Sequence, residues 1–187
     1  MATHETKLGV GKISGMFFHA PAGTALPTYP LETLNSAWES VGDVSDTGLT
    51  LTFEKSTTNL RNWANQLKRI IMTEHAETIS APIMDTTEEV FRTILGDAAV
   101  TATAASAQHG ALVTAKLSQE QLPDKEAYLF LMKDGDDAIA LGCTKGQITA
   151  MDAVTFAPNA AITWTPTITA LTRDGRSLPT TARQHKG

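Results

Sequence analysis

Alternation of apolar and polar side chains dominates the chain and predicts a protein built mainly of β-strands. The clearest case is AITWTPTITAL at 161–171, where apolar residues at every second position from 162 to 170 are separated by threonines. This period of two is typical of a strand with one buried face. Because proline cannot donate a hydrogen bond to a sheet, Pro166 predicts an edge strand or a bulge. Segments 48–55 and 99–104 alternate in the same way.

A second kind of strand is apolar on both sides. The segment AYLFLM at 127–132 predicts a strand that is buried on both faces. The Asp-Gly pair at 134–135 is a strong hairpin signal, since both residues tolerate positive φ, and AIALG at 138–142 would be the returning strand. The Lys-Gly pair at 145–146 predicts another turn.

One helix is well delimited, in MDTTEEVFRTILGD at 84–97. Asp85 or Thr86 is expected to cap its N-terminus, with the acidic pair at 88–89 placed to close a capping box and Gly96 to end the helix. Its apolar stripe consists of Val90, Phe91, Ile94 and Leu95. The segment 31–39 is expected to form a shorter helix or a loop.

The segment NLRNWANQLKRII at 59–71 is ambiguous. Its apolar residues fall at helical spacing, which favours a helix over about 58–70. The stretch that continues from it to residue 84 is equally compatible with a long strand or a hairpin.

The stretch GKISGMFFHAPAGTALPTYP at 11–30 places the bulky residues 16–18 before a loop that holds three prolines. Two interpretations stay open. One is a core strand followed by a surface loop. The other is an element against which further copies of the chain pack, because a loop stiffened by proline loses less entropy when it orders at an interface.

Length and composition indicate one globular domain, with or without arms. The 187 residues are 42% apolar and 19% charged, and the net charge of −5 argues against a surface devoted to binding nucleic acid. The only cysteine, Cys143, excludes an internal disulfide and a cysteine-rich zinc site, and is expected to be a small buried apolar residue. No run of about 18 apolar residues occurs, so no membrane insertion is expected.

The search for chemistry is negative. GVGKI at 9–13 lacks the remaining residues of a phosphate-binding loop, and DGDD at 134–137 lacks the glutamate that a calcium loop needs at its twelfth position. The histidines do not share one element at metal-ligand spacing, and His75, with glutamates on either side, is interpreted as part of a solvated strand face. We therefore expect neither an enzyme, nor a cofactor, nor a metal.

Charge is distributed unevenly along the chain. Between residues 73 and 97 there are six carboxylates and one cation, Arg92, whereas the last 17 residues carry an excess of basic side chains that includes Arg173 and Arg176. This asymmetry favours head-to-tail self-association. A solvated helix face followed by a loose tail is the alternative.

Three blocks in a fixed order resemble the major tail proteins, or tail tube proteins, of long-tailed phages without a contractile sheath. The first block runs from GMFFHAPAGTALP through GDVSDTGL to NWANQLKRI, within 15–70. The second is TEHAETISAPIMDTTEEVFRTILGD at 73–97, and the third runs from LPDKEAYLFLMKDGDD to WTPTITAL within 122–171.

The resemblance implies a mainly β fold with one flanking α-helix, a tail-tube-type β-sandwich or barrel over residues 10–172. An N-terminal arm would occupy 1–9 and a C-terminal arm would occupy 173–187. It further implies a helical turn near 59–64 followed by a strand from about Leu67.

The same resemblance implies that the chain forms homo-hexameric rings. These would stack into a tube around a tape-measure protein, between tail terminator and distal tail proteins, and viral DNA would pass through transiently. The protein would be made in the host bacterial cytoplasm and reside in the virion tail. A capsid decoration module or a receptor-binding module on a β-sandwich is the alternative.

Two sets of site residues follow from this resemblance. The residues expected between subunits are Phe17, Phe18, Pro21, Leu26, Pro27, Tyr29, Trp63, Arg173 and Arg176. The acidic residues expected to face the channel are Glu54, Glu74, Glu77 and Asp85.

Overall fold

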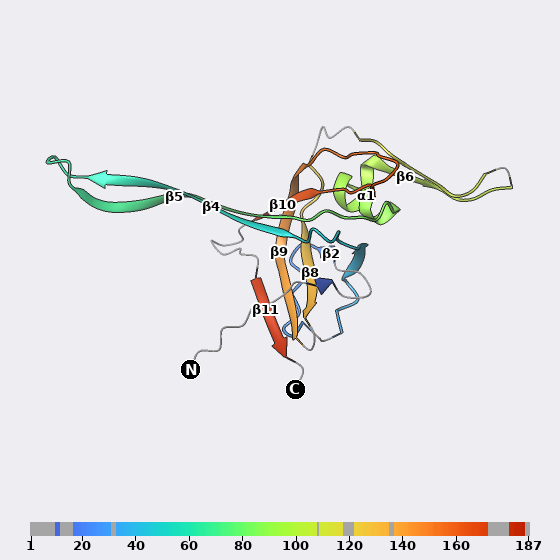
Figure 1. Cartoon of the computed structure of the whole chain (residues 1–187), viewed down its shortest axis with the longest axis horizontal. Coiled ribbons are helices and arrows are strands. Elements are labelled where there is room, and N and C mark those ends of the chain that lie inside the picture. Colours follow the sequence, from blue (N-terminus) through green and yellow to red (C-terminus); the bar gives the residue numbers. More distant parts are fainter. Residues whose placement is uncertain are drawn as a thin grey trace.

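The protein is an antiparallel β-structure with one α-helix, from which two hairpins project in opposite directions (Figure 1). A computed structural model describes residues 10–11, 17–30, 33–107, 109–117, 122–134, 137–171 and 180–185. The elements within these ranges are β1 (Val10–Gly11), β2 (Phe17–Pro21), β3 (Glu39–Gly42), β4 (Thr50–Arg61), β5 (Leu67–Ser80), α1 (Glu88–Leu95), a 3-10 turn (Asp97–Ala99), β6 (Val100–Thr103), β7 (Leu112–Ala115), β8 (Glu126–Asp134), β9 (Asp137–Met151), β10 (Pro166–Ala170) and β11 (Thr180–His185).

Nine of the strands form one sheet, whose path runs β3-β2-β8-β9-β10-β5-β4. Outside this path, β1 pairs with β8 and β11 pairs with β9, while β6 and β7 make a separate two-stranded sheet. The prediction of a mainly β fold with one helix is confirmed. Of the two expected terminal arms, the N-terminal one, 1–9, lies outside the described residues, and the C-terminal one, 173–187, contains β11.

The adjacent phenylalanines of β2 belong to two different cores on opposite faces of the sheet. Phe17 stacks on Phe130 of β8, with ring centroids 4.6 Å apart, in a cluster that also takes in Val90 and Ile94 of α1. Phe18 lies in a second cluster with Trp38 and residues of β8 and β9. A strand covered on both faces requires large apolar side chains at consecutive positions. This explains the Phe-Phe pair and confirms the core-strand interpretation for both residues.

Strand β8 is buried on both faces, as its sequence predicts, and so is the first half of β9. Their pairing of Asp134 with Asp137 confirms the predicted hairpin. The predicted turn at 145–146 is wrong, because β9 continues through it. Gly146 serves close packing instead, since a Cβ there would lie 2.9 Å from both Tyr128 Cδ2 and Cys143 Sγ. Cys143 is buried, as expected, and burial raises the pKa of its thiol to about 11.

Gly142 of β9 is a second position where the backbone packs too closely for a side chain. A Cβ would lie 2.5 Å from the carbonyl oxygen of Tyr128 and 2.8 Å from Leu26 Cδ2. We expect Gly142→Ala to lower the free energy of unfolding by about 1–3 kcal/mol through overpacking. Gly110→Ala is the matched control, because no atom lies within 4 Å of a Cβ there. Thermal melts of both variants test this, and equal melting temperatures would contradict it.

Residues 166–170 of the alternating segment form β10, and the predicted buried face is present: it includes Ile168 in the strand and Trp164 just before it. The expectation of an edge strand is wrong, since β10 lies between β9 and β5. The alternative of a bulge is confirmed by a register shift between Thr167 and Ile168. Pro166 is tolerated because it is the first residue of the strand.

Helix α1 begins one or two residues later than predicted. Its N-cap is Thr87, whose hydroxyl accepts a hydrogen bond from the Val90 N–H at 3.3 Å. Asp85 and Thr86 are engaged elsewhere: an Asp85 carboxylate oxygen accepts from the Asp43 N–H at 2.7 Å, and the Thr86 hydroxyl accepts from the Trp164 indole at 3.1 Å. Gly96 ends the helix, as predicted. The described part of 31–39 is a loop with a turn, not a second helix.

Candidate assembly surface

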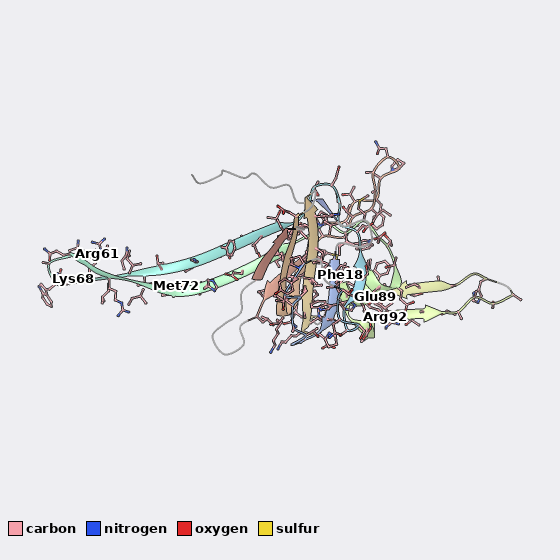
Figure 2. All side chains as sticks on the ribbon, turned by 90° about the horizontal axis from the view of Figure 1, so that it is seen from below. Phe18, Arg61, Lys68, Met72, Glu89 and Arg92 are labelled. Atoms are coloured by element: carbon pink, nitrogen blue, oxygen red, sulfur yellow. The ribbon has the colours of Figure 1, made fainter. Side chains whose placement is uncertain are left out.

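A long hairpin of β4 and β5 extends far from the rest of the molecule (Figure 1). Its outer part, residues 52–75, is exposed throughout except for the half-buried Asn62; we call these residues the arm. Figure 2 shows Arg61 and Lys68 near the end of the arm and Met72 part-way along it, whereas Phe18 lies within the body. Both faces of the arm are therefore exposed in the isolated subunit.

Large apolar side chains are concentrated on the arm. Seven of them are at least 41% exposed: Phe53, Leu60, Trp63, Leu67, Ile70, Ile71 and Met72. A helix over 58–70, which the periodicity favours, is wrong, and so is a helical turn over 59–64, because β4 continues to Arg61. The strand expected from Leu67 is confirmed.

Hydrogen bonds hold the end of the arm in a defined turn. The Asn62 N–H donates to the Gln66 carbonyl at 3.0 Å, and the Gln66 N–H donates to the Asn62 side-chain oxygen at 2.8 Å. Asn65 adopts φ 59°, a left-handed conformation that asparagine tolerates. This turn presents Trp63 with its side chain fully exposed. A rigidly held aromatic residue is a typical anchor of a protein interface.

The pairing of β4 with β5 sorts the acidic residues of the hairpin onto two faces. Phe53 pairs with Glu77, and Glu54 with Ala76, so Glu54 and Glu77 point to opposite sides. Ser56 pairs with Glu74, which places Glu74 on the same face as Glu54. Both of these residues are exposed.

Glu77 is buried and Asp85 is half-buried. The Glu77 side chain is buried, on the face that leads into the core, and its carboxylate lies 3.0 Å from His75 Nε2. His75 itself is exposed, as the solvated-face interpretation predicts, and it also contacts this buried carboxylate. Asp85 precedes α1 and is held by its contact with the Asp43 N–H.

The proline-containing loop at 21–30 contains both exposed and enclosed residues. Pro21 and Tyr29 are exposed, whereas Leu26 and Pro27 are half-buried and Leu26 packs against the second core. Phe17 and Phe18 are buried inside their own subunit, so they are not available to a neighbour in this conformation. Arg173 and Arg176 lie outside the described residues.

Sequence comparison connects this architecture to a known family. A family model described as phage tail tube protein matches residues 2–183. The chain belongs to the phage tail tube protein family. Among proteins with curated descriptions, none matches the chain significantly.

Membership confirms the resemblance carried by the three sequence blocks. The tail tube family is a structural one and not a known enzyme family, and membership makes the chain a component of the virion tail. In the part of the chain that the structure describes, no helix is long and apolar enough to cross a membrane.

Sequence reasoning missed most of the apolar residues on the arm as candidates for assembly. Only Trp63 was identified. Two register shifts, between Ser56 and Thr57 and between Leu60 and Arg61, interrupt the alternation of the hairpin. The three consecutive apolar residues 70–72 were the available signal, because such a run in a strand that leaves the body exposes apolar groups on both faces.

Proposed function

We propose that this tail tube protein assembles into hexameric rings that stack into a hollow tube, the conduit through which viral DNA reaches the host. The arm supports this proposal most strongly. Two strands joined by a turn are marginally stable alone in water. A hairpin of this length is therefore expected to gain partners on its sides from adjacent subunits.

The arm offers enough apolar surface to make such contacts favourable. Full burial of one large apolar side chain contributes about 1.5–3 kcal/mol. Part of this gain offsets the entropy lost on association. The exposed residues Leu112 and Val113 on the opposite hairpin, β6–β7, provide a second projecting element for contacts between subunits.

The acidic face of the arm is the proposed lining of the channel. Glu54 and Glu74 share this face with Thr52 and Ser56, so the part of it nearer the body is polar and negatively charged, whereas Leu60, Arg69 and Ile71 occupy the same face farther out. Carboxylates repel the phosphates of passing DNA over roughly the 8–10 Å screening length of physiological salt. Glu77, on the opposite face, and Asp85, beside Asp43, do not share this surface, and we base the proposal on Glu54 and Glu74 alone.

Among the members of the predicted intersubunit set that the structure describes, Pro21, Tyr29 and Trp63 are exposed and are retained as contacts between copies. Leu26 and Pro27 are half-buried in the same loop as Pro21 and Tyr29, and would hold that loop in position for these contacts. Arg173 and Arg176 are retained as basic residues that meet the acidic surface of a neighbour. Further partners would be a tape-measure protein within the tube and terminator and distal tail proteins at its ends, after synthesis in the host cytoplasm.

Electron microscopy of the purified full-length chain tests the proposal. We expect rings or tubes to form slowly at high protein concentration, because ring closure requires several weak contacts at once. A tape-measure fragment should accelerate their appearance. A chain that stays monomeric at high concentration with that fragment present would contradict the proposal.

A further inference from the structure

A histidine surrounded by carboxylates lies on the body of the subunit, away from the arm. His19 of β2 contacts two glutamates at once: its Nδ1 lies 3.0 Å from Glu126 of β8, and its Nε2 lies 2.8 Å from Glu89 of α1. A carboxylate oxygen of Glu39, on β3, completes the group. The ligand atoms of His19, Glu39 and Glu89 all lie within 4.8 Å of one another. Four different elements thus converge on one imidazole ring.

The His19 ring cannot donate hydrogen bonds to both glutamates while it is neutral and both carboxylates are ionised. An ionised carboxylate only accepts hydrogen bonds, and a neutral imidazole has a single N–H. Both contacts can be satisfied only when a second proton, or a cation in its place, lies between Nε2 and Glu89.

Among the described residues, Lys125 lines the same cavity, but no lysine or arginine forms an ion pair with Glu39, Glu89 or Glu126. Arg92, one turn after Glu88 on α1, directs its guanidinium to Glu88 at 2.7 Å and to Asp97 at 2.9 Å. Figure 2 labels Glu89 and Arg92 on the helix, at the side of the body opposite the arm. The cluster around His19 is therefore acidic.

We propose that His19, Glu39 and Glu89 bind a divalent transition-metal ion of the zinc class. One imidazole nitrogen and two carboxylates form a mixed nitrogen and oxygen donor set, which zinc accepts at about 2.0–2.2 Å. Glu126 would act as a positioning residue: by accepting the Nδ1–H of His19 it leaves the Nε2 lone pair directed toward the ion, as in carboxylate–histidine–metal arrangements.

The site has an entry path and room for the ligands to adjust. His19 and Glu39 line an open cavity of about 740 Å³, which is also lined by Asp124, Lys125 and Glu126. Glu39 is exposed, so its side chain can move toward the ion at little cost. Water from the cavity would complete the coordination. A bound ion would link side chains of β2, β3 and α1.

Titration of the tag-free, full-length chain with Zn²⁺ by calorimetry tests the site, with Mg²⁺ as the comparison ion. We expect one Zn²⁺ per subunit, a higher melting temperature in Zn²⁺, and much weaker binding of Mg²⁺, which prefers oxygen ligands. Glu39→Gln and His19→Asn should each weaken Zn²⁺ binding at least tenfold.

Glu88→Gln is the matched control, because it removes a carboxylate from the same helix without removing a proposed ligand. This variant should bind Zn²⁺ like the original chain. Glu39→Gln alters an exposed side chain, so it keeps the test valid if His19→Asn fails to fold. The absence of Zn²⁺ binding would overturn the proposal, as would binding that is unchanged in Glu39→Gln or equally weakened in Glu88→Gln.

Discussion

Replacement of residues 56–74 by Asn-Gly is expected to abolish tube formation while the subunit stays folded. Lys55 and His75 are paired, so a two-residue turn can join them without altering the register of the remaining hairpin. The deleted segment contributes no buried side chain to the subunit. It does carry six of the seven exposed large apolar residues of the arm, all except Phe53. The melting temperature should therefore change little, whereas electron microscopy should show no tubes.

A milder pair of variants separates the apolar contacts from the length of the arm. Ile70→Thr with Ile71→Thr keeps the β-branched shape but removes apolar surface, and should raise the protein concentration needed for assembly. Thr57→Ser with Thr58→Ser is the control, because these residues face Met72 and Ile71 across the hairpin and are already polar. For the first variant, in which Asn-Gly replaces residues 56–74, tube formation at the original protein concentration would show that the arm is dispensable.

The sequence predicts the core strands well, because burial leaves a clear mark on them. A strand with one covered face alternates, as in 161–171, and a strand with two covered faces is continuously apolar, as in 127–132. The pair Phe17-Phe18 shows the continuously apolar pattern. That pattern does not reveal whether the second face of the strand packs against its own subunit or against a neighbour. That distinction depends on the loop around Trp38, because Trp38 covers Phe18 as part of the second core.

Errors in the prediction arise where one residue type serves two physical purposes. The sequence predicts a turn at Gly146 because glycine is common in turns, whereas in the structure this glycine allows Tyr128 and Cys143 to pack against the backbone. Leu60, Trp63, Leu67 and Ile70 fall at helical spacing although they lie on β4, the turn and β5 in succession. The cluster around His19 is not visible in the sequence at all, since its members lie on four elements far apart along the chain.

Reversal of the charges on the acidic face of the arm is expected to slow DNA ejection strongly. Glu54→Lys with Glu74→Lys changes two exposed residues on one face, so it should leave folding and tube assembly intact. Every ring would then offer cations to DNA, which carries about one negative charge per 1.7 Å of its axis. Each phosphate contact releases counterions, and about 6–10 contacts make affinity fall by about 10³–10⁵ between about 50 and 200 mM salt.

The slowing should therefore be greatest at low salt and fade as salt rises, which ejection kinetics from particles that carry the variant would measure. Glu54→Gln with Glu74→Gln removes the negative charges without adding positive ones, and should slow ejection much less. Asp46→Lys with Asp152→Lys is the control for net charge, because both aspartates are exposed but lie off the arm and outside the cavity beside His19. If that control slows ejection as much as the arm variant, or if the arm variant ejects DNA at the normal rate at low salt, then Glu54 and Glu74 do not line the channel. The distinction matters physically, because a lining residue acts on DNA at short range, whereas net charge outside the tube is screened within about 10 Å.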